Sequence, residues 1–211
     1  LPRYAPWAAR VPWLMNLRNR IPGLAALTER ATGFAASRKL PIWSSKPFRD
    51  GELCDADPDV VIFADAFNRY FEPENLRSAG RVLRAAGLNV KAATPIDGCR
   101  PLDCGRTLLS VGLLEEARKE AERLVEALLP YAQKGIPIVG LEPSSILSLR
   151  DEIPSLITDG RADIVSENSF MLEEYLIKHA VALPLRALGQ KILLHGHCHQ
   201  KAHQVMPDVL S

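Results

Sequence analysis

The chain of 211 residues has no long apolar stretch, few cysteines and almost no net charge, and each shortage excludes a class of protein. No run approaches 18 uninterrupted apolar residues, so no transmembrane helix is expected. Pro2, Pro6 and Pro12 break up the first residues, which do not resemble a signal peptide. Four irregularly spaced cysteines do not suggest a disulfide scaffold, which favours a reducing, cytoplasmic compartment. A total charge of +1 gives no sign of nucleic-acid binding.

The charge is unevenly distributed along the chain. Residues 1–50 contain nine Lys or Arg and two Asp or Glu, a balance of +7, whereas residues 51–211 carry −6. The first segment also holds six prolines and all three tryptophans, with short helical candidates at 13–20 and 24–34 between the prolines. We therefore expect residues 1–50 to form a basic, Pro-rich helical arm that docks on an acidic surface of its own body or of a neighbouring domain. Contact with a membrane surface or with nucleic acid is the alternative.

The pattern changes at residue 60, inside a second region that we place at residues 51–211. Val60 to Ala64 is a continuous apolar run, typical of a strand buried on both faces. Predicted strands then alternate with predicted helices, which favours an α/β fold with a parallel sheet and helices on both of its faces. The predicted strands are 60–64, 89–93, 136–140 and 191–194, and the predicted helices are 73–86, 113–134, 145–152 and 167–180.

Residues that can carry chemistry follow the predicted strands. In open α/β sheets, ligands gather at the carboxyl ends of the strands. Three of the four cysteines and three of the five histidines fall at that edge, in the segments 97–106 and 195–199. The segment His195-Gly-His197-Cys198-His199 places four borderline or soft ligands within five residues, which suits a transition metal.

Structural interpretations compete with these functional ones. A histidine in a loop commonly hydrogen-bonds a backbone carbonyl, and a lone cysteine is usually a small buried apolar residue. On balance we interpret Cys104 and Cys198 as functional, Cys99 as undecided and Cys54 as incidental. The sequence has no close C-x-x-C pair and no dinucleotide or phosphate loop. Glu142-Pro-Ser144-Ser145 does not have the pattern of a nucleophile elbow, and no catalytic residue is predicted.

Four segments carry a resemblance to a known family. They are Asp65–Glu74 (DAFNRYFEPE), Pro101–Thr107 (PLDCGRT), Gly140–Ser145 (GLEPSS) and His195–Ala202 (HGHCHQKA). In these segments the chain resembles the cysteine-rich "CCG" domain of the iron–sulfur subunits of glycolate oxidase and lactate-utilisation enzymes, and of the related heterodisulfide reductase subunit. It is also similar to the C-terminal part of fused FAD-linked oxidase/ferredoxin proteins. The resemblance covers about residues 60–205.

The resemblance implies a [4Fe–4S] cluster site, from which this chain departs. The family has two adjacent cysteines where this chain has Asp103-Cys104, and a cysteine where it has Ser145, and it keeps Cys198. A further Cys-Cys-Gly segment follows in the family, so we expect the chain to be truncated at its C-terminus. The cofactor-binding positions implied are Asp103, Cys104, Ser145 and Cys198. Since thiolates are the normal cluster ligands, we expect little or no cluster to bind here.

The resemblance also implies a function and partners. In the family, an FAD domain oxidises a 2-hydroxy acid such as glycolate or D-lactate, and iron–sulfur centres pass the electrons to a membrane acceptor. This chain would be a fragment of the iron–sulfur electron-transfer subunit, without activity by itself. Its partners would be a flavin-containing dehydrogenase domain or subunit and a ferredoxin-like domain, with no nucleic acid, in the cytoplasm at the inner face of the membrane.

Two alternatives to this function stay open at the level of sequence. The first is a degenerate domain that binds no cluster and serves in docking or structure. The second is a mononuclear zinc or iron site that uses Cys104, Cys198 and a histidine, His197 or His199.

Overall fold

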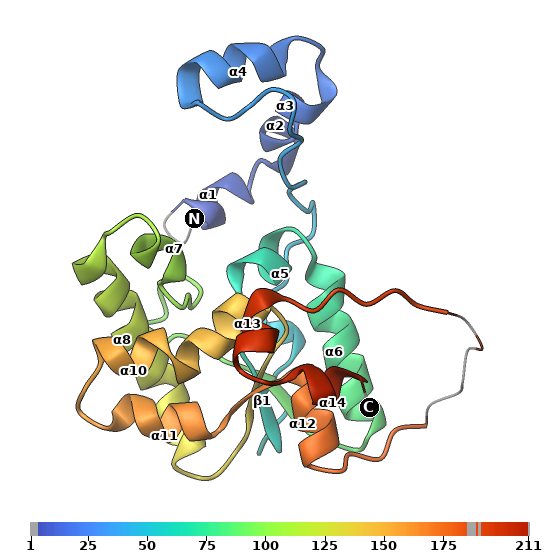
Figure 1. Cartoon of the computed structure of the whole chain (residues 1–211), viewed down its shortest axis with the longest axis vertical. Helices are drawn as coiled ribbons and strands as arrows, with labels where there is room; N and C mark the ends of the chain where they lie inside the picture. The colour runs from blue at the N-terminus through green and yellow to red at the C-terminus, as the bar shows by residue number, and fades with distance from the viewer. Residues whose placement is uncertain (1–3, 185–188, 190, 211) are drawn as a thin grey trace.

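The computed structural model describes residues 4–184, 189 and 191–210 and consists of an α/β body with an arm projecting from it (Figure 1). Four short parallel strands form one sheet in the order β2-β1-β3-β4. Their bounds are β1 Val60–Ile62, β2 Val90–Ala92, β3 Ile138–Gly140 and β4 Ser169–Met171. The predicted α/β class is therefore confirmed. In the described part of the chain, no helix combines the length and the apolar character needed to cross a membrane.

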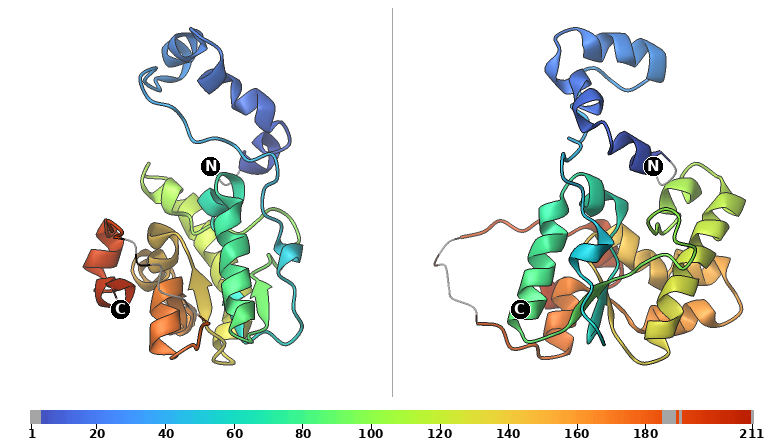
Figure 2. Two further views of the ribbon diagram at one scale, coloured as in Figure 1. Left: turned by 90° about the vertical axis from the view of Figure 1, so that its right-hand side faces the viewer. Right: turned by 180° about the vertical axis from the view of Figure 1, so that it is seen from behind.

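Alternation along β1 divides the core into two layers. Val61 and the following Phe63 face one side of the sheet, whereas Val60 and Ile62 face the other. The long helix α8 covers the first layer and α6 covers the second (Figure 2). The side chains on both faces of the sheet are consequently buried. The helices of the body before the sheet's last strand are α5 Ala66–Tyr70, α6 Pro73–Ala85, α7 Arg106–Leu109, α8 Leu114–Ala132, α9 Pro143–Ile146, α10 Glu152–Leu156 and α11 Arg161–Glu167, with 3-10 turns at η1 Asp50–Glu52 and η2 Leu147–Arg150.

Three predicted strands coincide with observed ones, and the fourth prediction was wrong. Residues 191–194 form no strand, and Leu193 is fully exposed at 102%. The fourth strand is β4, which lies inside the segment predicted as a helix at 167–180. Its residues pair in parallel with β3, with Ile138 opposite Ser169. That segment divides into the end of α11, β4 and then α12 Leu172–Lys178, and the chain closes with α13 Cys198–Ala202 and α14 Met206–Leu210.

Pro137 does not disturb the sheet, although β3 is a central strand. It directly precedes the strand, where its missing N–H is not needed, and its carbonyl accepts a hydrogen bond from the Val61 N–H at 2.9 Å. The strand after it ends at Gly140, where an added Cβ would lie 2.6 Å from the Cβ of Ile146. This close approach lets α9 begin directly above the carboxyl end of β3.

The arm consists of four short helices, α1 Ala5–Ala8, α2 Pro12–Met15, α3 Leu17–Arg20 and α4 Leu24–Thr32. Pro12 begins α2, and Pro22 and Gly23 separate α3 from α4. Arg18 organises it, because its guanidinium donates to the carbonyl oxygens of Phe34, Ala35 and Arg38 at 2.9–3.1 Å. Trp43 joins the arm to the body and is buried among α1 and α5 side chains. The remainder of the arm extends away from the sheet (Figure 1).

Candidate functional site

A small cavity of about 160 Å³ lies at the carboxyl edge of the sheet. Three elements bound it, namely the turn after β1, the loop into α7 and the start of α9. Its lining includes Phe63, Asp65, Asp103, Cys104, Thr107 and Ser145. Ligand sites of open parallel sheets lie at this edge. The structure therefore brings three of the predicted cofactor-binding residues, Asp103, Cys104 and Ser145, to one place.

The loop that carries Asp103 and Cys104 is fixed by close backbone packing against α8. Gly105 has φ +76°, and a Cβ there would lie 2.8 Å from the Ala117 carbonyl oxygen, so only glycine fits. The Asp103 carboxylate accepts a hydrogen bond from the Gly105 N–H at 2.8 Å. Burial raises the pKa of Asp103 despite this hydrogen bond. The carboxylate thus holds the loop rather than pointing freely at a ligand.

Cys104 is a buried thiol in the main apolar core. Burial, together with the nearby charge of Asp103, raises its pKa to about 12, although hydrogen bonds from Arg106, Ser145 and Ser148 act in the opposite direction. In the absence of a metal ion, a thiol of this kind is protonated at neutral pH and is a poor nucleophile. Ser145 is itself buried, and its hydroxyl forms a hydrogen bond with Cys104.

A second carboxylate of the cavity is also engaged by the backbone. Asp65 caps α5, since it accepts hydrogen bonds from the N–H groups of Phe67 and Asn68 at 2.9 and 3.0 Å and from the Asn68 side chain at 2.7 Å. Burial raises its pKa, and the charge of Glu142 adds to the rise. By contrast, Thr107 Oγ1 is buried with no hydrogen-bond partner in the described structure.

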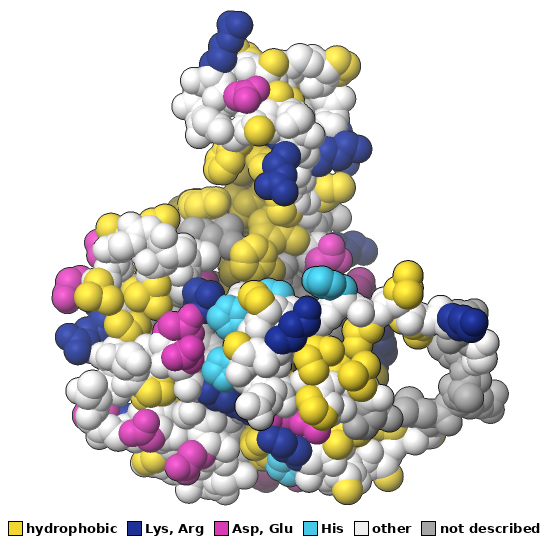
Figure 3. Space-filling view, viewed as in Figure 1, with side chains coloured by type: hydrophobic (Ala, Val, Ile, Leu, Met, Phe, Trp, Pro, Cys, Tyr) yellow, Lys and Arg dark blue, Asp and Glu magenta, His cyan; other side chains and the backbone are white. Residues whose placement is uncertain are grey.

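The histidine-rich segment lies on a separate element, α13, rather than at the end of a strand. His197 caps this helix through Nδ1, which accepts from the His199 N–H at 3.2 Å. The rings of His197, His199 and His203 form a column with centroid separations of 5.4 and 6.4 Å. Histidine side chains accordingly gather on the face drawn in Figure 3. Cys198 is exposed, with its sulfur 3.7 Å from His197 Nδ1.

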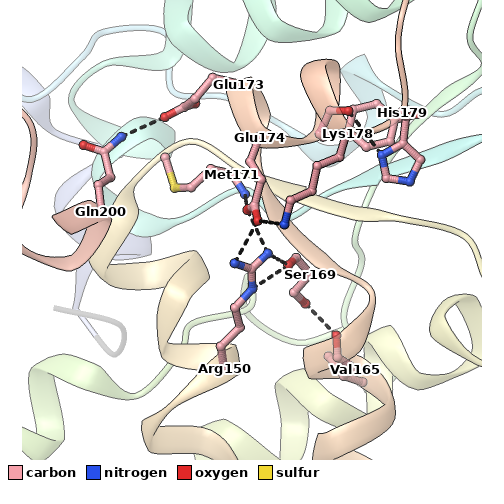
Figure 4. A network of polar contacts seen from close by, with 10 residues as sticks. Arg150, Val165, Ser169, Met171, Glu173, Glu174, Lys178, His179 and Gln200 are labelled. Carbon is pink, nitrogen blue, oxygen red and sulfur yellow. Dashed lines mark hydrogen bonds and ion pairs between the residues drawn. The ribbon is translucent and has the colours of Figure 1, made fainter. Parts of the chain in front are cut away.

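A polar network attaches α13 to the body (Figure 4). Gln200 donates to Glu173 on α12 at 2.7 Å. The next residue, Glu174, is buried and pairs with Arg150 at 2.8 Å and with Lys178 at 2.7 Å. Arg150 also donates to the Ser169 carbonyl of β4 at 2.8 Å. The end of the sheet, α12 and the histidine segment are thereby linked.

His199 connects the two groups of predicted site residues. Its pKa is lowered by burial and by the positive charge of Arg106, a residue of the cavity loop. Arg106 forms an ion pair with Glu152 at the start of α10. Neither Arg106 nor Glu152 was predicted as a site residue. Arg106 lies inside the PLDCGRT segment, but 46 residues separate it from Glu152, and no local pattern marks that pairing.

The residues present do not fit a [4Fe–4S] cluster. Such a cluster needs four ligands, normally thiolates, around one centre. Cys104 lines the cavity, whereas Cys198 and His197 are not among the residues that line it. Within residues 4–184 and 191–210, no three His, Cys, Asp or Glu side chains are grouped to hold a metal ion.

The chain is similar in sequence to components of dehydrogenases. Over 198 residues the chain is 26% identical to the C subunit of the anaerobic glycerol-3-phosphate dehydrogenase of Escherichia coli strain K12, a match that takes in 89% of this chain and 48% of that subunit. It is 23% identical over 210 residues to the D-2-hydroxyglutarate dehydrogenase of the same strain. The chain is related to dehydrogenase sequences. The D-2-hydroxyglutarate dehydrogenase of Pantoea ananatis is 21% identical over 213 residues.

These relatives are longer than the chain. It spans about half of the glycerol-3-phosphate dehydrogenase subunit and a fifth of either D-2-hydroxyglutarate dehydrogenase. No family model and no solved structure matches the sequence. Relatedness to components of redox enzymes is consequently established at low identity, and assignment to the cysteine-rich iron–sulfur domain stays a prediction.

Proposed function

We propose that this chain is a module of the iron–sulfur electron-transfer part of an FAD-linked dehydrogenase that oxidises a 2-hydroxy acid of the glycolate or D-lactate type. Within that assembly, the chain serves as a docking and structural domain and does not itself hold a [4Fe–4S] cluster. Its partners are a flavin-containing dehydrogenase domain or subunit and a ferredoxin-like domain. FAD belongs to the partner, and the assembly works in the cytoplasm at the inner face of the membrane.

One observation carries this proposal. It is the cavity at the carboxyl edge of the sheet, in a chain that is related in sequence to dehydrogenases. The cavity has the place of a ligand site, but its two buried carboxyl groups are hydrogen-bonded within the protein. Asp65 and Asp103 serve backbone N–H groups, and Cys104 is held neutral by burial. Groups so committed suit a stable scaffold better than a centre that gains and loses electrons.

The mononuclear-metal alternative gains less support from the geometry. It requires Cys104, Cys198 and a histidine around one ion. Cys104 is buried at the cavity wall, whereas Cys198 is exposed on α13.

The assembly that contains this chain provides the test. It should be purified with its partners, and its flavin absorbance and dye-linked activity measured with glycolate, D-lactate, glycerol 3-phosphate and D-2-hydroxyglutarate. We expect bound flavin and oxidation of a 2-hydroxy acid by the assembly, and neither from the isolated chain. An assembly that contains no flavin and oxidises none of the four substrates would refute the proposal.

A further inference from the structure

The arm carries a surface that combines exposed aromatic rings with positive charge. We use the term arm surface for the exposed side chains of Trp7, Arg10, Trp13, Leu14 and Arg20. Trp7 and Trp13 are 67% and 61% exposed, and the Arg10 guanidinium lies 4.4 Å from the centre of the Trp7 ring. Neither Arg10 nor Arg20 forms an ion pair in the described structure. Tryptophan and arginine are the residue types most enriched where proteins bind one another.

The body carries a complementary surface where α7 turns into α8. This acidic turn consists of Val111, Leu113, Leu114, Glu115 and Glu116. Val111 and Leu114 are 68% and 55% exposed, although side chains of this type are usually buried. The two glutamates occupy the first turn of α8 and have no ion-pair partner within the described ranges. Apolar side chains beside unpaired acids match apolar rings beside unpaired arginines.

The occupant that fits the arm surface is a second copy of this chain. We propose that the arm surface of one copy docks on the acidic turn of another, and that the reverse contact closes a two-fold symmetric dimer. The molecule itself supplies both halves of the interface, with a balance of +7 in residues 1–50 and −6 in the rest. A reciprocal pair of contacts satisfies both surfaces and leaves no open end.

The arrangement of the arm supports contact between two copies. α2 to α4 extend beyond the body in all views, and α1 lies between them and the body (Figures 1 and 2). The buried link to the body is made by Trp43, and the arm's outer rings remain exposed. Two antiparallel copies can therefore place each arm beside the other's turn. An anionic membrane suits this molecule less, because the acidic body would be repelled from it.

The dimer can be tested on the full chain by sedimentation velocity and light scattering over a concentration series. At low ionic strength we expect twice the monomer mass, and added salt should shift the equilibrium towards monomer, since exposed charges are screened within about 10 Å at 0.1 M. Arg10→Glu with Arg20→Glu should weaken the dimer at least about tenfold. Glu115→Arg with Glu116→Arg should do the same, whereas Lys134→Glu, just beyond the far end of α8, should have no effect.

Mixing the two charge-reversed variants is the decisive experiment. In the mixed pair, an acidic arm meets a basic turn and a basic arm meets an acidic turn, so both contacts are attractive again. We expect a one-to-one heterodimer from variants that are each monomeric alone. Circular dichroism checks that each variant is folded. If the variant with Glu115→Arg and Glu116→Arg does not fold, the variant with Arg10→Glu and Arg20→Glu still tests the dimer, because Arg10 and Arg20 are exposed.

Three results would overturn the proposal. The first is a wild-type chain that stays monomeric at every concentration in low salt. The second is a dimer that both charge reversals leave intact. The third is a monomeric wild-type chain that instead co-sediments with vesicles containing phosphatidylglycerol but not with phosphatidylcholine vesicles, which would assign the arm to an anionic membrane.

Discussion

Cys104 should react very slowly with thiol reagents in the folded chain, in contrast to the other three cysteines. Cys54, Cys99 and Cys198 are exposed, and Cys104 is buried. Because only the thiolate reacts, a rise of the pKa from 9.0 to about 12 lowers the reactive fraction of Cys104 near pH 8 about a thousandfold. Burial adds a second barrier, since the reagent must wait for the core to open.

A thiol count with Ellman's reagent at pH 8 measures this directly. We expect three thiols to react rapidly in the native chain and the fourth to react only when denaturant unfolds it. Cys104→Ala should keep the three fast thiols and lose the slow one. Cys99→Ala, as the matched control, should leave two fast thiols and one slow thiol.

The refuting result is equally simple. If Cys104→Ala removes a fast thiol, then Cys104 is accessible and at least partly ionised. The site would then have one of the properties of a metal-binding cysteine, and its geometry would no longer count against a cluster.

The remaining predictions concern the cluster, the arm, the polar network and pH. Anaerobic reconstitution should yield well under one iron per chain, and about four iron and four sulfide would contradict the interpretation of the site. Limited proteolysis in the 48–59 linker should release an arm that does not melt cooperatively by itself, because about 50 residues rich in proline can bury little core. Arg150→Ala should lower the free energy of unfolding by about 3 kcal/mol, because it removes a partner of the buried Glu174, and urea unfolding with Arg161→Ala as an exposed control measures this. Since the pKa of His199 is lowered by burial and by Arg106, the unfolded chain binds the proton more readily. Stability should therefore fall as the pH drops through about 6.5, and urea midpoints should show less of this loss in His199→Gln.

The sheet was predictable where apolar runs coincide with strand pairing. Val60 to Ala64 is apolar throughout and lies at the centre of the sheet, so sequence and structure agree. The segment 191–194 is apolar after Lys191, yet it forms no strand. Strand propensity shows only that a segment can adopt an extended conformation, and it does not show which strand the segment would pair with. Ser169 to Met171 shows the converse, since three residues between two helical segments leave no period to detect.

The site was predictable only as far as strand order determines it. Asp103, Cys104 and Ser145 share the cavity because each follows a strand that was placed correctly, and the carboxyl ends of parallel strands share one edge. His197 and Cys198 were assigned to that edge through a strand that does not form. The Arg106–Glu152 pair and the role of Ser148 depend on contacts between distant segments, which no local pattern contains.

The charged groups of the cavity differ in their contacts from those of the two proposed contact surfaces. Inside the cavity, burial raises the pKa of Asp65 and of Asp103, and both carboxyl groups accept hydrogen bonds from backbone N–H groups. Outside, Arg10 and Glu115 form no ion pair with any described residue, and Trp7 and Leu114 keep apolar area in water. Contact between two such surfaces would lower the free energy of association, because it buries apolar area and pairs opposite charges. These exposed side chains therefore favour the proposed contact between two copies of the chain.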